Sequence, residues 1–179
     1  MTAYEALNPE VEVNGQTIRS VVEAFPPALQ GRGEEILARN GIEDPEAGEW
    51  YPQQAWLDAF TELHERMGPA TLARIGKEIP RNADWPPDAE TIVDGVESID
   101  KAYHMNHRGG EIGSYDVERI DPETIAVRCD TPYPCPFDLG IVKSVVDEFG
   151  DRPASVRETG SECREDGADE CRYDVRIRR

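Results

Sequence analysis

The spacing of apolar residues changes from helical to alternating at Gly109-Gly110. Before this pair, apolar side chains recur every three or four residues, which is the period of an amphipathic helix. After it, apolar and polar residues alternate over 112–120 and 124–130, which is the period of a strand with one buried face. A chain with this order of elements is typical of an α+β fold, because its helices come first and its sheet follows.

Proline and glycine mark where the expected helices begin and end. Pro26-Pro27, Asn40-Gly41 and Gly68-Pro69 each follow a stretch with helical spacing. We expect residues 1–16 to be a leader that ends in a turn, residues 42–50 to be a polar loop, and Gly76 to permit the close approach of a neighbouring element. The expected helices cover about 17–25, 28–40, 51–67, 69–79 and 88–103, the last capped by Asp88.

The second half of the chain predicts two pairs of antiparallel strands. The first pair turns at Asp121-Pro122, a helix follows at about 136–149, and two more strands close the chain. The predicted fold is therefore α+β, with N-terminal helices packed against one face of a C-terminal antiparallel sheet and one helix inserted between the strand pairs. The length of 179 residues suits a single domain, 1–179. We divide it into a helical extension over 1–50 and a ligand-binding-like α+β core over 51–179.

Charge restricts the partners that this chain can have. Lys and Arg number 19 and Asp and Glu number 37, so the net charge is −18. Nucleic acid is excluded as a default partner, since binding phosphates needs a basic surface. No polybasic segment, signal-peptide pattern or long apolar run is present, so we expect a cytoplasmic protein with no membrane contact. Only three of the basic residues are lysines, and an acid excess with scarce lysine is typical of halophilic proteins.

Four cysteines are the main candidates for chemistry. In a reducing compartment they are more often thiols or metal ligands than disulfides. Cys135 lies at a helix start, and Cys163 and Cys171 flank the acidic turn EDGADE, so a hairpin would place those two side by side. Zinc prefers thiolate and imidazole ligands in such a setting. Cys129 completes the candidate set, although it shares a strand face with Ile125 and Val127 and also fits a core position; four buried cysteines without metal remain the alternative.

Two segments carry a resemblance to a known superfamily. PYPCPFDLG before an apolar helix, followed by C-x7-C in a hairpin that ends CRYDVRIR, resembles the 4-vinyl-reductase type of small-molecule-binding domain. It also resembles the C-terminal half of heme nitric oxide/oxygen binding (H-NOX) proteins, whose superfamily includes Golgi-transport particle subunits. With YPQQAWLDAF, MGPATLARIGKEIP and SIDKAYHMNHRGGEIGSY, the resemblance covers about residues 50–179.

The resemblance implies a structural zinc ion but no heme. Some bacterial H-NOX proteins bind zinc through three cysteines that look like Cys135, Cys163 and Cys171, and through a histidine where this chain has Gly160. The fourth ligand is therefore open among Cys129, His104, His107, Glu162 and water. Heme-binding members clamp the propionates with a Y-x-S-x-R motif, and the corresponding stretch VRCDTPYPCPFDLG lacks that motif; Tyr115, Val117 and Arg119 imitate only its spacing.

The function that we expect is a non-catalytic small-molecule-binding or sensor module with a structural zinc site. Its ligand would be small and apolar, held between helices and sheet. No G-x-S-x-G, P-loop or G-x-G-x-x-G motif is present. The alternatives are an enzyme acting on a tetrapyrrole-like or other apolar small molecule, and a dimeric scaffold, so a homodimer stays open. The candidate ligand-binding residues are His104, His107, Tyr103, Trp56 and Tyr115.

We predict that the melting temperature rises with KCl. The net charge of −18 repels itself at low ionic strength. Raising the salt from about 0.1 M to about 1 M shortens the screening length from about 10 Å to about 3 Å. Thermal unfolding followed by circular dichroism across this range checks the prediction, and a flat or falling melting temperature would overturn the halophile assignment.

Overall fold

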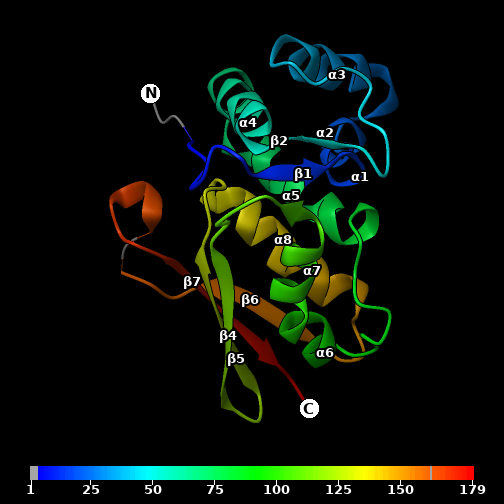
Figure 1. Ribbon diagram of the computed structural model, residues 1–179. Coiled ribbons are helices and arrows are strands. Elements are labelled where there is room, and N and C mark those ends of the chain that lie inside the picture. Colours follow the sequence, from blue (N-terminus) through cyan, green and yellow to red (C-terminus); the bar gives the residue numbers. More distant parts are fainter. Residues whose placement is uncertain (1–3, 162) are drawn as a thin grey trace.

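The structure is a computed structural model that describes residues 4–161 and 163–179, and it confirms the predicted α+β fold (Figure 1). The helices are α1 (Gly15–Ile18), α2 (Ser20–Glu23), η1 (Pro27–Leu29), α3 (Gln30–Arg39), α4 (Gln53–Met67), α5 (Pro69–Asn82), α6 (Ile92–Glu97), α7 (Ile99–Met105), α8 (Cys135–Glu148) and η2 (Arg164–Asp166). The strands are β1 (Glu12–Asn14), β2 (Trp50–Pro52), β3 (His107–Arg108), β4 (Ser114–Asp121), β5 (Thr124–Asp130), β6 (Ala154–Glu158) and β7 (Cys171–Ile177).

The main sheet is antiparallel, with strand order β4-β5-β7-β6. Helix α8 connects β5 to β6, so it is inserted between the strand pairs as the sequence predicts. Tyr115, Val127 and Tyr173 lie on the inner face, where α7 and α8 cover the sheet. Asp116 and Arg176 lie on the outer face and are exposed, because alternate side chains of a strand point to opposite faces.

A second, three-stranded sheet with order β2-β1-β3 corrects the prediction of a leader over residues 1–16. Val13 is fully buried and is paired with Tyr51 on one side and His107 on the other. A strand of three residues is too short to show alternation, so only the pairing with distant segments reveals it. This sheet holds the chain just after α7 and thereby positions His107.

The helical region departs from prediction at several places. Tyr51 and Pro52, expected to begin a helix, belong to β2, and α4 begins at Gln53. The helix expected over 17–25 is two short helices, α1 and α2. The helix expected over 88–103 is divided into α6 and α7, and Thr91 rather than Asp88 caps it, since Thr91 and Asp94 form a reciprocal capping box. Helix α5 continues to Asn82 with Pro80 inside its last turn. Pro80 has no amide to donate to the carbonyl oxygen of Gly76, so this turn lacks one helical hydrogen bond.

Two glycines set the separation between α5 and α8, as expected for Gly76. A Cβ atom on Gly76 would lie 2.1 Å from the carbonyl oxygen of Phe137, and one on Gly140 would lie 2.2 Å from that of Ala73. The helix backbones therefore meet directly, without intervening side chains. This contact fixes the first turn of α8, which carries Cys135 and Asp138, relative to the N-terminal helices.

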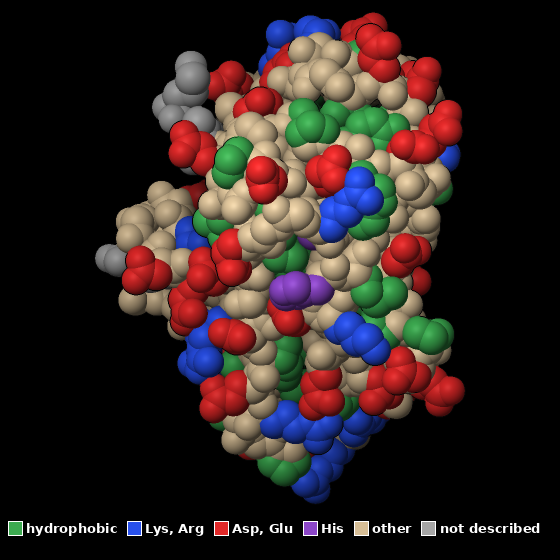
Figure 2. All heavy atoms as spheres, viewed as in Figure 1, with side chains coloured by type: hydrophobic (Ala, Val, Ile, Leu, Met, Phe, Trp, Pro, Cys, Tyr) green, Lys and Arg blue, Asp and Glu red, His purple; other side chains and the backbone are tan. Residues whose placement is uncertain are grey.

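Buried apolar side chains form one cluster that runs from Tyr4 to Ile177. The division into an extension and a core at residue 50 stays a prediction. None of the helices in the described part of the chain has the length and apolarity needed to cross a bilayer. Acidic side chains are spread over the face seen in Figure 2, while basic side chains gather at its lower end, near the C-terminus.

We predict that Gly76→Ala and Gly140→Ala each destabilise the protein by about 2 kcal/mol or more, because the new methyl group would force α5 and α8 apart. The matched control is Gly31→Ala in α3, where a Cβ meets nothing within 4 Å. This substitution should stabilise the protein by about 0.5–1 kcal/mol through helix propensity. Urea unfolding measures both effects, and equal responses at the three sites would contradict the role of the close contact.

Candidate metal centre and adjoining cavity

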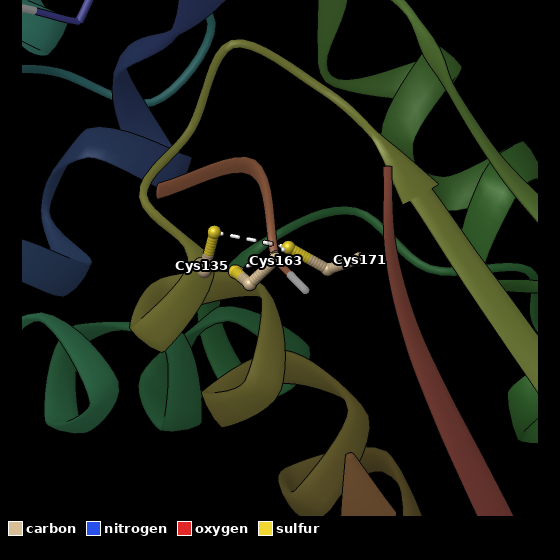
Figure 3. Close-up of side chains that lie close together, drawn as sticks. All are labelled: Cys135, Cys163 and Cys171. Carbon is tan, nitrogen blue, oxygen red and sulfur yellow. Dashed lines mark hydrogen bonds between the residues drawn. The ribbon is translucent and has the colours of Figure 1, made fainter. Parts of the chain in front are cut away.

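Three of the four cysteines converge on one point (Figure 3). Cys135 begins α8, Cys163 precedes η2 and Cys171 begins β7. Their Sγ atoms all lie within 4.8 Å of one another, and Cys171 Sγ lies 2.8 Å from Cys163 Sγ and 3.0 Å from Cys135 Sγ. All three side chains are buried. The predicted cysteine trio is therefore assembled from three separate segments into a group that can hold a metal ion.

Local backbone structure brings each sulfur to this point. Pro134 is extended and starts α8 immediately, which leaves Cys135 at the first helical position. Cys163 begins a tight turn in which its carbonyl oxygen accepts from the amides of Asp166 and Ala168. Gly167 closes that turn with a φ of 98°, which other residues rarely adopt. The chain then reverses and enters β7 at Cys171.

The three thiols share protons because they contact one another. The hydrogen bond with Cys135 is the main cause that lowers the pKa of Cys171 to about 4. Burial raises the pKa of Cys163 to about 11, and the hydrogen bond with Cys171 raises that of Cys135. One thiolate stabilised by two thiols is a ready ligand, since a soft cation can replace the remaining protons.

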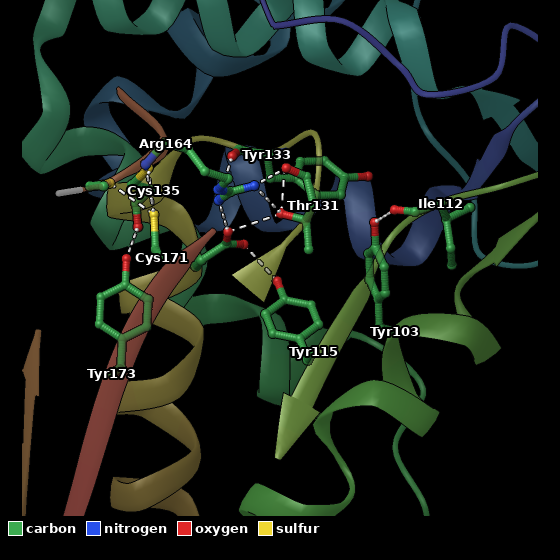
Figure 4. A network of polar contacts seen from close by, with 11 residues as sticks. Tyr103, Ile112, Tyr115, Thr131, Tyr133, Cys135, Arg164, Cys171 and Tyr173 are labelled. Carbon is green, nitrogen blue, oxygen red and sulfur yellow. Dashed lines mark hydrogen bonds and ion pairs between the residues drawn. The ribbon is translucent and has the colours of Figure 1, made fainter. Parts of the chain in front are cut away.

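A buried ion pair lies beside the cysteine trio (Figure 4). The guanidinium of Arg164 pairs with the carboxylate of Asp138, and it also donates to the carbonyl oxygens of Thr131 and Tyr133. The backbone amide of Arg164 lies 3.4 Å from Cys171 Sγ. The pair therefore contacts both the segment between Cys163 and Cys171 and the loop before α8.

Asp138 connects this pair to the inner face of the sheet. Its carboxylate is fully buried and accepts from the Tyr115 hydroxyl at 2.6 Å and from the Thr131 hydroxyl at 2.9 Å. Burial raises the pKa of Asp138 to about 6, against the opposing effect of the Arg164 guanidinium. Sequence reasoning missed both Asp138 and Arg164. Carboxylates are too abundant in this chain for Asp138 to be distinctive.

A cavity of about 30 Å³ lies between the helices and the sheet. Four of the five predicted ligand-binding residues line it: Trp56, Tyr103, His107 and Tyr115. Tyr133 and Phe137, which sequence reasoning missed, also line it, and their rings lie 5.2 and 5.8 Å from the ring of Trp56. The aromatic residues share one apolar space, although whether they bind a ligand stays a prediction.

His104 is the one predicted ligand-binding residue that does not line this cavity. Its side chain is 53% exposed, and its Nδ1 lies 2.9 Å from the carbonyl oxygen of Asp100, one turn earlier in α7. The residue therefore lies on the outer side of the helix and does not line the cavity. His104 and His107 are three residues apart, and the chain leaves helical geometry at Asn106, so the two side chains point in different directions.

His107 is buried with both ring nitrogens hydrogen-bonded. Nδ1 lies 2.7 Å from the carbonyl oxygen of Tyr103, to which it donates. Nε2 therefore accepts from the Tyr133 hydroxyl at 2.6 Å, and that hydroxyl accepts in turn from Nε2 of Gln53 at 3.0 Å. Burial lowers the pKa of His107 to about 4, so the ring is neutral at ordinary pH.

Cys129 is not a member of the sulfur group in the described part of the chain. It lies on β5 directly opposite Cys171 on β7, is fully buried, and has a pKa raised by burial. The packing agrees with the core position that its strand face indicates. Neither His104 nor His107 belongs to the sulfur group, and Glu162, another candidate for the fourth ligand, lies outside the described residues.

Comparisons with known proteins identify the fold alone. No protein-family model matches the chain, and no curated protein matches it. Among solved structures, an oxygen-binding H-NOX domain related to soluble guanylate cyclases is 16% identical, with a TM-score of 0.66 over 92% of this chain and 93% of that one. An H-NOX protein from S. oneidensis is 12% identical, with a TM-score of 0.66 over 93% and 99%. A variant of T. tengcongensis H-NOX is 15% identical, with a TM-score of 0.65 over 93% and 98%. The chain therefore has an H-NOX-like fold.

The side chains around the cavity do not fit a heme as they are arranged here. The space of about 30 Å³ is far smaller than the roughly 300 Å³ or more of pockets that hold ligands of drug size. Aromatic rings of Trp56, Phe137 and Tyr133 fill the region, and neither nitrogen of His107 is free to ligate iron without losing a hydrogen bond.

We predict that His107 makes stability depend on pH between about 7 and 5. Its pKa is about 4 when folded and 6.5 when unfolded, so the unfolded state binds the extra proton and stability falls as pH drops below 6.5. At about pH 5 the protonation of His107 in the unfolded state lowers the free energy of unfolding of the wild type by about 2 kcal/mol. The His107→Gln protein should lack this loss, whereas His104→Gln, at an exposed site, should keep it. Chemical unfolding at both pH values checks this, and parallel pH slopes for all three proteins would refute it.

Proposed function

We propose that the protein is a non-catalytic small-molecule-binding or sensor module in which a zinc ion, bound by Cys135, Cys163 and Cys171, ties α8 to the hairpin before β7. The observation that carries this proposal is the convergence of three buried sulfurs within 4.8 Å. Thiolates are preferred zinc ligands, and a metal held by groups far apart in the sequence contributes directly to folding free energy. The ion would act as a cross-link between helix and sheet.

The ligand that we propose is a small and largely apolar molecule bound in the aromatic cavity. Solved neighbours of this fold are named for heme, oxygen and Fe(II)NO complexes. We infer that this chain retains no heme, and the small volume and the two hydrogen bonds of His107 support that inference. A ligand entering here would displace the ring of Tyr115, whose hydroxyl donates to Asp138, and so act on the ion pair of Asp138 and Arg164.

Several finer points belong to the same proposal. The relation to 4-vinyl-reductase domains rests on the C-x7-C hairpin and the PYPCPFDLG segment. A cytoplasmic and halophilic setting rests on the net charge of −18 and the three lysines. An enzymatic role or a dimeric scaffold stays an alternative. Within residues 4–161 and 163–179, the large apolar side chains that are exposed come from different parts of the fold: Leu7, Leu29, Met105 and Ile120.

We predict one zinc ion per chain in protein purified without chelator. Native mass spectrometry should give the chain mass plus one zinc and no porphyrin. Cys171→Ser should lose the metal and melt at a lower temperature, because the hairpin would no longer be tied to α8. Cys129→Ser is the matched control, since it removes a buried thiol of the adjacent strand and should keep the zinc.

Two results would contradict the proposal. Wild-type protein that carries no zinc after reconstitution under reducing conditions would refute the metal site. A stoichiometric porphyrin mass, with a Soret absorption band, would refute the inference that heme is not retained.

A further inference from the structure

A crevice of about 160 Å³ reaches Cys135 from the surface. Tyr4, Tyr133 and Arg164 form part of its wall, and the exposed side chains of Glu5 and Glu165 also line it. The crevice is distinct from the aromatic cavity, because Tyr133 is the one lining residue that the two have in common in the described structure. Of the three cysteines of the sulfur group, Cys135 alone lines this crevice, so the crevice ends against that edge of the group.

The described residues provide no fourth protein ligand at the sulfur group. The group contains three cysteines and no histidine or carboxylate from the described part of the chain. Each histidine is engaged elsewhere: Nδ1 of His64 lies 2.7 Å from the Tyr4 hydroxyl, His104 contacts Asp100, and His107 bonds to Tyr133. Zinc is almost always four-coordinate, and sites with three protein ligands keep a position for an outside donor.

We propose that the fourth coordination position of this metal site is exchangeable. It would be occupied by the sulfur of a small thiol with a positively charged tail, such as an aminothiol, which enters through the crevice beside Cys135. This inference rests on the proposed zinc site. A cavity of about 150 Å³ admits benzene, so a crevice of about 160 Å³ has room for a donor with about six heavy atoms. The thiol would bind as a thiolate, and its proton would pass to solvent.

The charges around the crevice select the charge of the ligand. Three thiolates carry three negative charges, which a divalent cation only partly neutralises. The positive charge of Arg164 is offset by its partner Asp138. Glu5 and Glu165 add two more negative charges along the crevice. An anionic donor is therefore repelled, whereas a positively charged tail is attracted to these carboxylates.

Cobalt substitution tests this inference without any assay of activity. Co²⁺ bound by thiolates gives visible bands that report its coordination, so the cobalt-loaded protein is titrated under argon with cysteamine and with mercaptoacetate. These two thiols are of similar size and have opposite tail charges. At the lowest KCl concentration that keeps the protein folded, cysteamine should reach half-saturation at a concentration about tenfold lower than mercaptoacetate. Native mass spectrometry confirms that cobalt stays bound.

Variants separate the crevice carboxylates from the rest of the acidic surface. Glu5→Gln combined with Glu165→Gln should narrow the difference between the two half-saturation concentrations. The matched control is Glu118→Gln combined with Glu97→Gln, two exposed carboxylates on β4 and α6 that do not line the crevice, and it should preserve the difference.

Each failure has a separate meaning. Protein that binds no cobalt or zinc would refute the proposed metal site. Cobalt bound through the three thiolates, with bands that neither thiol changes, would leave the metal site standing and overturn the exchangeable position. A response that appears only in Glu162→Gln or Cys129→Ser would overturn it too, because that residue would then be the fourth ligand. Equal affinity for the two thiols would overturn the assigned ligand charge.

Discussion

The buried ion pair between Arg164 and Asp138 is the interaction on which both candidate sites depend. Burying charges is costly, and hydrogen bonds offset part of that cost. Of the polar atoms of this pair, Nε of Arg164 lacks a partner among the described residues. Here Asp138 accepts from Tyr115 and Thr131, while Arg164 donates to the carbonyl oxygens of the loop before α8. The pair therefore connects the start of α8, the main sheet and the turn that carries Cys163. Loss of either partner would leave an uncompensated charge where these three elements meet.

The first turn of α8 carries residues that belong to both sites. Cys135 faces the sulfur group, Phe137 lines the aromatic cavity, and Asp138 holds Arg164. The direct backbone contact of Gly76 and Gly140 keeps this turn in place against α5. A displacement of the turn by a ligand in the cavity would be felt at the sulfur group, because closely packed elements move together rather than deform. This packing supports the proposal of one sensor module rather than two independent sites.

Prediction from the sequence succeeded where the signal is local and regular. Helices α4, α5 and α8 and the four strands of the main sheet have long periodic patterns, and the structure confirms them within a few residues. The cysteine trio was predicted because Cys135 begins a helix and Cys163 and Cys171 flank a turn. Prediction failed for β1, β2 and β3, which are short. The sequence also did not show that His107 turns inward and His104 outward, because the end of α7 decides this.

The sequence by itself determined the order of elements, the face that each strand buries and the surplus of negative charge, since all three follow from residue type and spacing. Only the tertiary structure decided which polar groups meet. The pairing of Asp138 with Arg164, the bond from Tyr133 to His107 and the separation of Cys129 from the other sulfurs depend on contacts between segments far apart in the chain. Such contacts leave no periodic trace, because any of the 37 carboxylates could have been the buried one until packing chose its partner.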